Sequence, residues 1–265
     1  MPQIMRDSAH LLLSNWILLL KIGAVLFLFS LVRWYLLGDL HLLSEEQQAE
    51  RLFGTPLYWL VFLIEIPFLT AAAVACHRLF LLGPDEAGGL RPYALNGRVL
   101  RFFGWILVIA LLFVLMLIVG IFISFILFSM IPPLANLPEV AIELLMLVLL
   151  LPAGVVLASW SLLLPAVALG HDHGGLKWAF DLAEGNRWTL TMMVYVIPVA
   201  GLLLLPYLPV WAFTGTDLAL EWIGMLVTVF SLCMLSLSYG QLRRYMEHNK
   251  ATSSSQFGET AFSSN

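Results

Sequence analysis

The sequence predicts an all-α membrane protein folded as a six-helix transmembrane bundle. Of its 265 residues, 61% are hydrophobic and only 11% are charged, whereas a soluble domain usually has about 25% charged residues. Residues 102–138 contain no Asp, Glu, Lys or Arg, and neither do residues 144–170, 188–216 and 222–242. Because an α-helix needs about 20 apolar residues to cross a bilayer core of about 30 Å, we expect several membrane crossings.

The six predicted spans follow one another with short loops between them. The first covers residues 16–37, where Trp16 and Tyr35 lie about 28 Å apart along a helix and so reach opposite interfaces. The second, 57–79, begins with Tyr58 and Trp59, and the third, 102–130, stops before two prolines. The others cover 138–169, 188–211 and 222–242. Residues 1–250 are therefore expected to form a single six-span domain.

The two ends of the chain are interpreted separately. The first apolar run is too long for the hydrophobic region of a secretory signal peptide, so we expect it to remain as the first span. Residues 251–265 are rich in Ser and Thr and predict a disordered cytoplasmic tail.

The distribution of Lys and Arg predicts which side of the bundle faces the cytoplasm. One side has only Arg33 and Arg51, and its loops are acidic. The other side collects ten basic residues, which are Arg6, Arg78, Arg91, Arg98, Arg101, Lys177, Arg187, Arg243, Arg244 and Lys250. Because positive charge marks the cytoplasmic side, both termini are expected there, which agrees with an even number of spans.

Two of the cytoplasmic loops share a sequence pattern. Residues 82–91 read LGPDEAGGLR, and residues 169–177 read LGHDHGGLK. The similarity predicts two related helix hairpins, the second span with the third and the fourth with the fifth, in the same orientation. The alternative is a chance likeness between two glycine-rich turns.

A short amphipathic segment follows the glycines of the second loop. Leu176, Ala179, Phe180 and Ala183 have the spacing of one helix face. We expect short cytoplasmic amphipathic helices in both loops, lying in the headgroup plane. Packing across the end of the bundle uses the same face and is the alternative. The candidate interfacial residues are Lys177, Trp178, Phe180 and Arg187.

Glu65 is the main candidate for an intramembrane polar site. It follows Trp59 by six residues, which places it roughly 9 Å inside the interface. A charged residue within a span costs about 2.5–3.5 kcal/mol on insertion scales, so such residues usually face the bundle interior. Three interpretations stay open: a structural pair with Arg33, a proton- or cation-responsive site, and a protonated bystander.

No catalytic, cofactor or metal site stands out in the sequence. Cys76 and Cys233 lie in apolar runs without metal-binding spacing and are expected to be packed thiols. His171 and His173 lie in a glycine-rich loop and are expected to be solvated. Because there is no evident nucleophile–base pair and no basic block, we expect neither an enzyme nor a nucleic-acid-binding protein.

The second half of the chain resembles a known family. Residues 159–168 (SWSLLLPAVA), 179–188 (AFDLAEGNRW) and 237–243 (LSYGQLR) are similar to a family of uncharacterised bacterial inner-membrane proteins with about six helices. This family is related to the membrane domain of glycerophosphodiester phosphodiesterases. The resemblance covers the last three spans and implies an integral protein of the bacterial inner membrane. It implies no phosphodiesterase activity, because the chain has no phosphodiesterase domain.

The sequence as a whole favours a non-enzymatic inner-membrane protein. We expect a role in envelope or lipid homeostasis, or as a membrane scaffold, with membrane lipids and a membrane protein or a second copy of the chain as partners. The alternative is a small transporter or lipid-translocating protein with a polar site around Glu65 and Arg33.

Overall fold

The computed structural model describes residues 2–38, 40–84, 93–130, 148–171, 175–197 and 216–262. All regular secondary structure within these ranges is helical. Five of the described helices are long and apolar enough to cross a membrane: Trp16–Leu37, Pro56–Leu82, Gly97–Ile126, Leu151–Leu169 and Asp217–His248. The protein is thus an all-helical, multi-pass membrane protein, as the sequence predicts.

The predicted fifth span is described only at its start. There α10 (Arg187–Thr191) continues into one turn of π-helix, η3 (Met192–Val196). In this turn the Ile197 amide bonds to the Met192 carbonyl, five residues earlier. Residues 198–211 of this span and residues 138–147 of the fourth lie outside the described residues, as do His173 and residues 85–92 of the first patterned loop. The count of six spans and the two hairpins therefore stay predictions.

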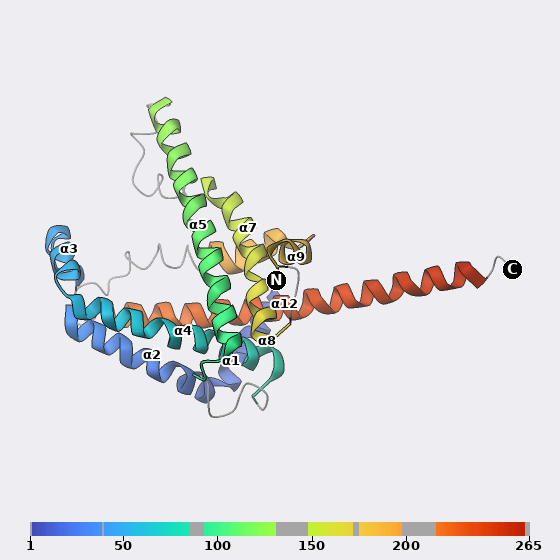
Figure 1. Cartoon of the computed structure of the whole chain (residues 1–265), viewed down its shortest axis with the longest axis horizontal. Coiled ribbons are helices and arrows are strands. Elements are labelled where there is room, and N and C mark those ends of the chain that lie inside the picture. Colours follow the sequence, from blue (N-terminus) through green and yellow to red (C-terminus); the bar gives the residue numbers. More distant parts are fainter. Residues whose placement is uncertain are drawn as a thin grey trace.

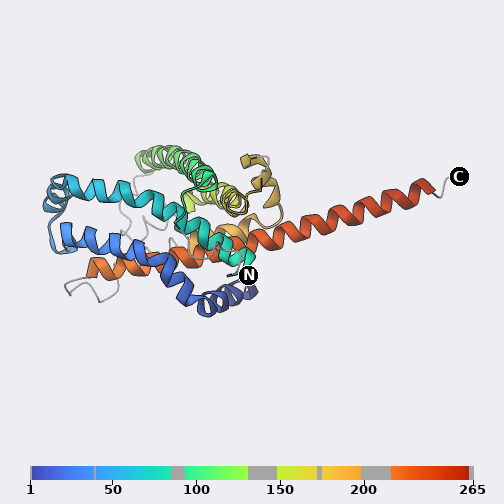
Figure 2. The same ribbon diagram turned by 60° about the horizontal axis from the view of Figure 1, so that its bottom comes forward.

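Three helices lie side by side and form one layer of the molecule (Figures 1 and 2). They are α2 (Trp16–Leu37), α4 (Pro56–Leu82) and the first part of α12 (Thr216–Phe262). Small residues of α4, such as Ala72 and Ala75, pack beside Ile22 and Leu26 of α2 and allow the helices to approach closely. Cys76 and Cys233 are buried and free, which confirms that they are packed thiols.

A second group of helices runs across this layer (Figure 1). It consists of α5 (Gly97–Met130), α7 (Leu151–Ser161) and α8 (Leu163–Leu169). α7 ends at Ser161, four residues before Pro165, because a proline has no N–H to donate and its ring clashes with the carbonyl of residue i−4. Beyond its first turns α5 is largely exposed, as expected of a helix that faces lipid.

The core lies where the two groups of helices meet. Four residues are almost fully buried there: Phe102 of α5, Leu162 between α7 and α8, Ala166 of α8, and Tyr239 of α12. The end of the described fold that adjoins this core is called the basic end, because it carries Arg98, Arg101, Arg187, Arg243 and Arg244. The other end, where α2 stops and α4 and α12 begin, is called the acidic end, because Glu50, Asp217 and Glu221 lie there. The side on which each end lies in the membrane stays a prediction.

Two helices outside the predicted spans complete the described fold. The N-terminal α1 (Pro2–Ser14) packs on α12 with Ile4 and Ser8 buried. At the acidic end, α3 (Glu45–Phe53) begins with a capping box, in which Ser44 Oγ accepts from the Gln47 amide and Gln47 Oε1 accepts from the Ser44 amide. With 13 and 9 residues, both helices are shorter than the roughly 20 apolar residues by which a span is identified.

The last helix is longer than the span that the sequence predicts. α12 begins six residues before the predicted span and continues to Phe262, through residues expected to be a disordered tail. The first turns past the span contain good helix formers, and Arg243 pairs with Glu247 one turn later, an arrangement that supports an exposed helix.

Candidate functional site

Three charged side chains from three helices meet inside the acidic end. The Arg33 guanidinium on α2 pairs through Nη1 with Glu65 Oε2 on α4, and through Nη2 with Glu221 Oε1 on α12. We call Arg33, Glu65 and Glu221 the ion network. Their side chains are 14%, 8% and 30% exposed, respectively. The structure thus contains the pair of Arg33 with Glu65, which is one of the three interpretations of Glu65, and adds Glu221 as a third member that the sequence does not predict.

The positions of these residues follow from helix periodicity. Arg33 lies seven residues after the buried Leu26 on α2, and Glu65 lies seven residues before the buried Ala72 on α4. Residues at this spacing share a helix face, so both charged groups point toward the packed centre of the layer. Glu221 lies in the second turn of α12. The hydropathy pattern predicts a last span that starts at residue 222, which places Glu221 in a loop.

The network balances a buried charge with two partners. An unpaired ion in a low-dielectric interior is costly, and pairing with good geometry offsets this cost. The arginine fork is suited to the task, because its separate N–H groups can each reach a carboxylate. With both carboxylates ionised, the network has one positive and two negative charges.

Cavities lie on both sides of the ion network. The outer cavity, of about 490 Å³, is at the acidic end and is lined by Gln48, Tyr58 and Asp217 together with Arg33 and Glu221. The inner cavity, of about 200 Å³, is lined by Glu65 and apolar residues together with Arg33 and Glu221. Since Arg33 and Glu221 line both cavities, the network forms part of the wall between them.

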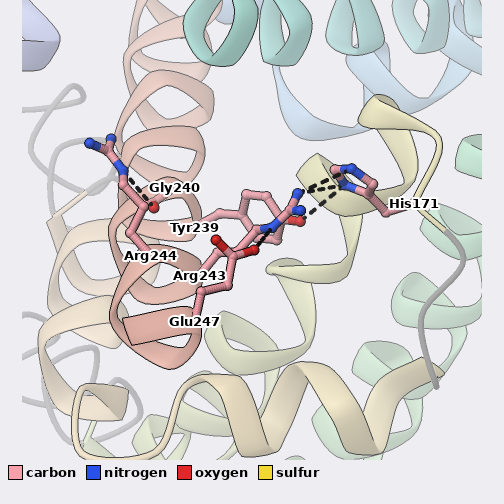
Figure 3. Close-up of polar contacts among 6 residues, drawn as sticks. All are labelled: His171, Tyr239, Gly240, Arg243, Arg244 and Glu247. Carbon is pink, nitrogen blue, oxygen red and sulfur yellow. Dashed lines mark hydrogen bonds and ion pairs between the residues drawn. The ribbon is translucent and has the colours of Figure 1, made fainter. Parts of the chain in front are cut away.

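A polar cluster holds the end of α8 against α12 at the basic end (Figure 3). Arg243 Nη1 lies 3.1 Å from both ring nitrogens of His171, and Tyr239 Oη lies 3.4 Å from His171 Nδ1. Arg243 Nε donates to Glu247 Oε1 at 2.9 Å. The glycine-rich sequence around His171 predicts a solvated side chain. The structure corrects this, because Gly170 ends α8 in a left-handed conformation and the next residue meets α12.

The predicted interfacial segment caps the bundle. It forms α9 (Gly175–Leu182), in which Ala179 is fully buried and Leu182 nearly so. Trp178 packs edge-on against Tyr239 with ring centroids 6.4 Å apart. The Arg187 guanidinium lies 3.7 Å from the centre of the Phe180 ring and donates to the Phe180 carbonyl. Lys177 is exposed. The sequence predicts that this segment lies in the headgroup plane, and the structure corrects this because its apolar face packs on protein.

A buried histidine and serine form a further contact that sequence reasoning missed. His77 Nδ1 on α4 lies 2.7 Å from Ser236 Oγ on α12, and both residues are fully buried. The Ser236 hydroxyl also lies 2.7 Å from the Leu232 carbonyl, so it has a backbone acceptor and the His77 ring within hydrogen-bonding distance. Because both side chains are enclosed by the core, the contact links α4 to α12. The two residues are 159 positions apart, so no local pattern reveals them.

Comparison with known proteins assigns the chain to no family. No family model matches the chain, and no curated protein or solved structure is significantly similar to it. The resemblance to the bacterial inner-membrane family therefore stays a prediction. Among the described residues, no group of three or more His, Cys, Asp and Glu side chains is placed to hold a metal ion.

Proposed function

We propose that this chain is a non-enzymatic protein of the bacterial inner membrane that acts in envelope or lipid homeostasis, with both termini in the cytoplasm. The observation that supports the proposal is the ion network. Its arginine is bonded on both sides by carboxylates from neighbouring helices, which links α2, α4 and α12. The most prominent charged residues inside the membrane thus join helices together.

A scaffold or lipid-handling protein suits this arrangement better than an enzyme does. Catalysis needs a reactive group beside a cavity that admits substrate. The buried histidine and serine are enclosed by the core instead, and α5 presents a long apolar surface to the bilayer. Interaction with membrane lipids, or with another membrane protein, is the activity that such a surface supports.

Native mass spectrometry tests this proposal. The full chain is released gently from membranes, and wild type is compared with Glu65→Gln. Lipids or a partner protein retained equally by both forms are the expected result. A small molecule that stays with the wild type and leaves the variant would contradict the proposal, as would turnover of any lipid in a panel incubated with the protein.

A second candidate function is a small transporter with its site at Arg33 and Glu65. The observation in its favour is the pair of cavities that share Arg33 and Glu221 in their walls. A transporter should lose its cellular phenotype in Glu65→Gln while the variant is expressed and unfolds at the wild-type temperature. Loss of thermal stability in that variant, matched by Arg33→Gln, would favour the structural role.

A further inference from the structure

We infer that the basic end binds the phosphate headgroup of an anionic phospholipid, in a cavity beside the start of α5. The inference deepens the proposed role in lipid homeostasis, on which it rests, by naming a lipid class and its site. The cavity has a volume of about 370 Å³, within the range of about 300–1,000 Å³ typical of small-molecule sites. Its polar lining comes from Asn96, Arg98, Arg101 and His171.

The charges around this cavity match a phosphate group. Arg98 and Arg101 both line it, and no carboxylate does so among the described residues. His171, which also lines the cavity, lies 3.1 Å from Arg243 Nη1 through each ring nitrogen, so a third guanidinium contacts one of the lining residues. Arginine pairs with phosphate through two parallel N–H groups, and basic pockets between transmembrane helices bind anionic lipid headgroups.

Arg98 is held in position by the end of α8. Gly170 has φ +82°, and a Cβ at this residue would lie 3.2 Å from Arg98 Nη2 and 3.4 Å from Nε. The guanidinium therefore packs against the glycine backbone, where any side chain would crowd it. This contact holds the Arg98 guanidinium, which belongs to α5, against the end of α8.

The side chains supply the binding groups, because the helix terminus is already occupied. Asn96 Oδ1 accepts from the amides of both Arg98 and Val99 at 3.1 Å. These two N–H groups at the start of α5 are consequently satisfied within the protein. A bound phosphate would be held by the guanidinium groups of Arg98 and Arg101.

An adjoining apolar cavity indicates that the phosphate belongs to a lipid. This cavity, of about 440 Å³, shares Asn96 and Gly97 with the basic one and is otherwise lined mainly by apolar residues of α4 and α5, including Pro67, Leu100 and Phe103. Leu100 is 71% exposed, so an apolar side chain of this cavity lies on the outer surface of the described fold. A molecule with a phosphate next to acyl chains fits both cavities, whereas a free phosphate needs only the first.

Aromatic placement agrees with a headgroup at this level. Trp105 lines the basic cavity one helical turn after Arg101. Tryptophan is enriched where hydrocarbon meets headgroups. Trp105 therefore adds to the cavity a residue type that commonly lies beside lipid headgroups.

Lipid retention by arginine variants tests the site. Full-length protein is reconstituted with equal amounts of phosphatidylglycerol and phosphatidylcholine, and bound lipid is counted by native mass spectrometry. The variants are Arg98→Gln with Arg101→Gln, Arg101→Gln alone, and the control Arg244→Gln. Arg244 is an exposed arginine at the same end whose Nε donates to the Gly240 carbonyl. Thermal unfolding in phosphatidylcholine checks that each variant is folded.

We expect wild type and Arg244→Gln to retain phosphatidylglycerol in preference to phosphatidylcholine. The double variant should retain at most about one tenth of the phosphatidylglycerol that the wild type retains, and Arg101→Gln should retain an intermediate amount. Equal retention by the double variant and wild type would overturn the site, as would an equal loss in Arg244→Gln. Displacement of the lipid by millimolar inorganic phosphate would show a free-phosphate site instead. Conversion of phosphatidylglycerol to a product would contradict only the non-enzymatic role.

Discussion

At the scale of single residues, polar contacts between helices hold the described fold together. Arg33 and Glu65 lie on consecutive antiparallel spans at similar depths, so their spacing allows the pair that the structure contains. Glu221 needed the packing of α12 against both helices. The contact between His77 and Ser236 likewise exists only once α4 and α12 are packed together.

Removing either main partner of the ion network should destabilise the bundle. In Arg33→Gln two carboxylates lose their cation, and in Glu65→Gln the most buried carboxylate is neutralised. Breaking a buried ion pair typically costs about 3–5 kcal/mol, so the thermal unfolding temperature in detergent should fall for both variants. The double variant should lose less than the sum of the single losses.

Glu50→Gln is the matched control, because this glutamate is exposed at the same end. Its unfolding temperature should equal that of the wild type. Additive losses in the Arg33 and Glu65 double variant would show that the two side chains do not interact in the folded protein.

Gly170→Ala should destabilise the end of α8. The left-handed φ of +82° disfavours a Cβ by roughly 1–2 kcal/mol, and the new methyl group would crowd Arg98. Gly104→Ala is the control, since nothing lies within 4 Å of a Cβ at that α5 position. Thermal unfolding of the two variants compares them directly, and an equal effect of both substitutions would contradict the strained conformation.

At the scale of elements, hydropathy located the long helices well and the short ones poorly. The first span was predicted as residues 16–37, and α2 covers Trp16–Leu37. The second was predicted as 57–79, and α4 covers Pro56–Leu82. In contrast, α3 has a local signal in its capping box of Ser44 and Gln47, which a search for apolar runs does not detect. For α9, the amphipathic face was correct, but a pattern cannot distinguish protein from lipid as its partner.

Substitutions on α9 should distinguish a bundle cap from a helix in the headgroup plane. Ala179 is fully buried, so Ala179→Leu would overpack its contacts at a typical cost of about 1–3 kcal/mol. Lys177→Leu, on the exposed face of the same helix, should leave the thermal unfolding temperature nearly unchanged. If α9 lay among headgroups, Ala179→Leu would instead strengthen lipid contact without lowering the unfolding temperature.

At the scale of the whole molecule, composition was sufficient to predict a helical membrane protein, and charge asymmetry predicted which residues share an end. Arg98 of α5, His171 beside α8 and Arg243 of α12 come from three separate stretches and lie around one site. The way α5 and α7 run across the layer of α2, α4 and α12 was not predictable (Figure 1). It depends on which small and large residues face each other, and not on the hydropathy of each segment.

Cysteine labelling should determine the orientation of the molecule. The native Cys76 and Cys233 are buried, so they should react slowly in the folded protein. Because basic residues mark the cytoplasmic side, a membrane-impermeant maleimide added to intact spheroplasts should label Glu46→Cys and spare Glu184→Cys and His248→Cys. All three positions are exposed, and all should react after the cells are broken. Labelling of the last two in intact spheroplasts would reverse the orientation.

The composition of the ion network also gives the protein an electrical property. With both glutamates ionised, Arg33, Glu65 and Glu221 leave one uncompensated negative charge within a membrane-spanning layer. A charge that crosses the full transmembrane potential changes in energy by about 2.3 kcal/mol per 100 mV, and a fixed charge part-way across experiences a fraction of this. In that protonation state the energy of the acidic end depends on whether the membrane is polarised. Stabilities measured in detergent lack this contribution, which acts only while the cell maintains its membrane voltage.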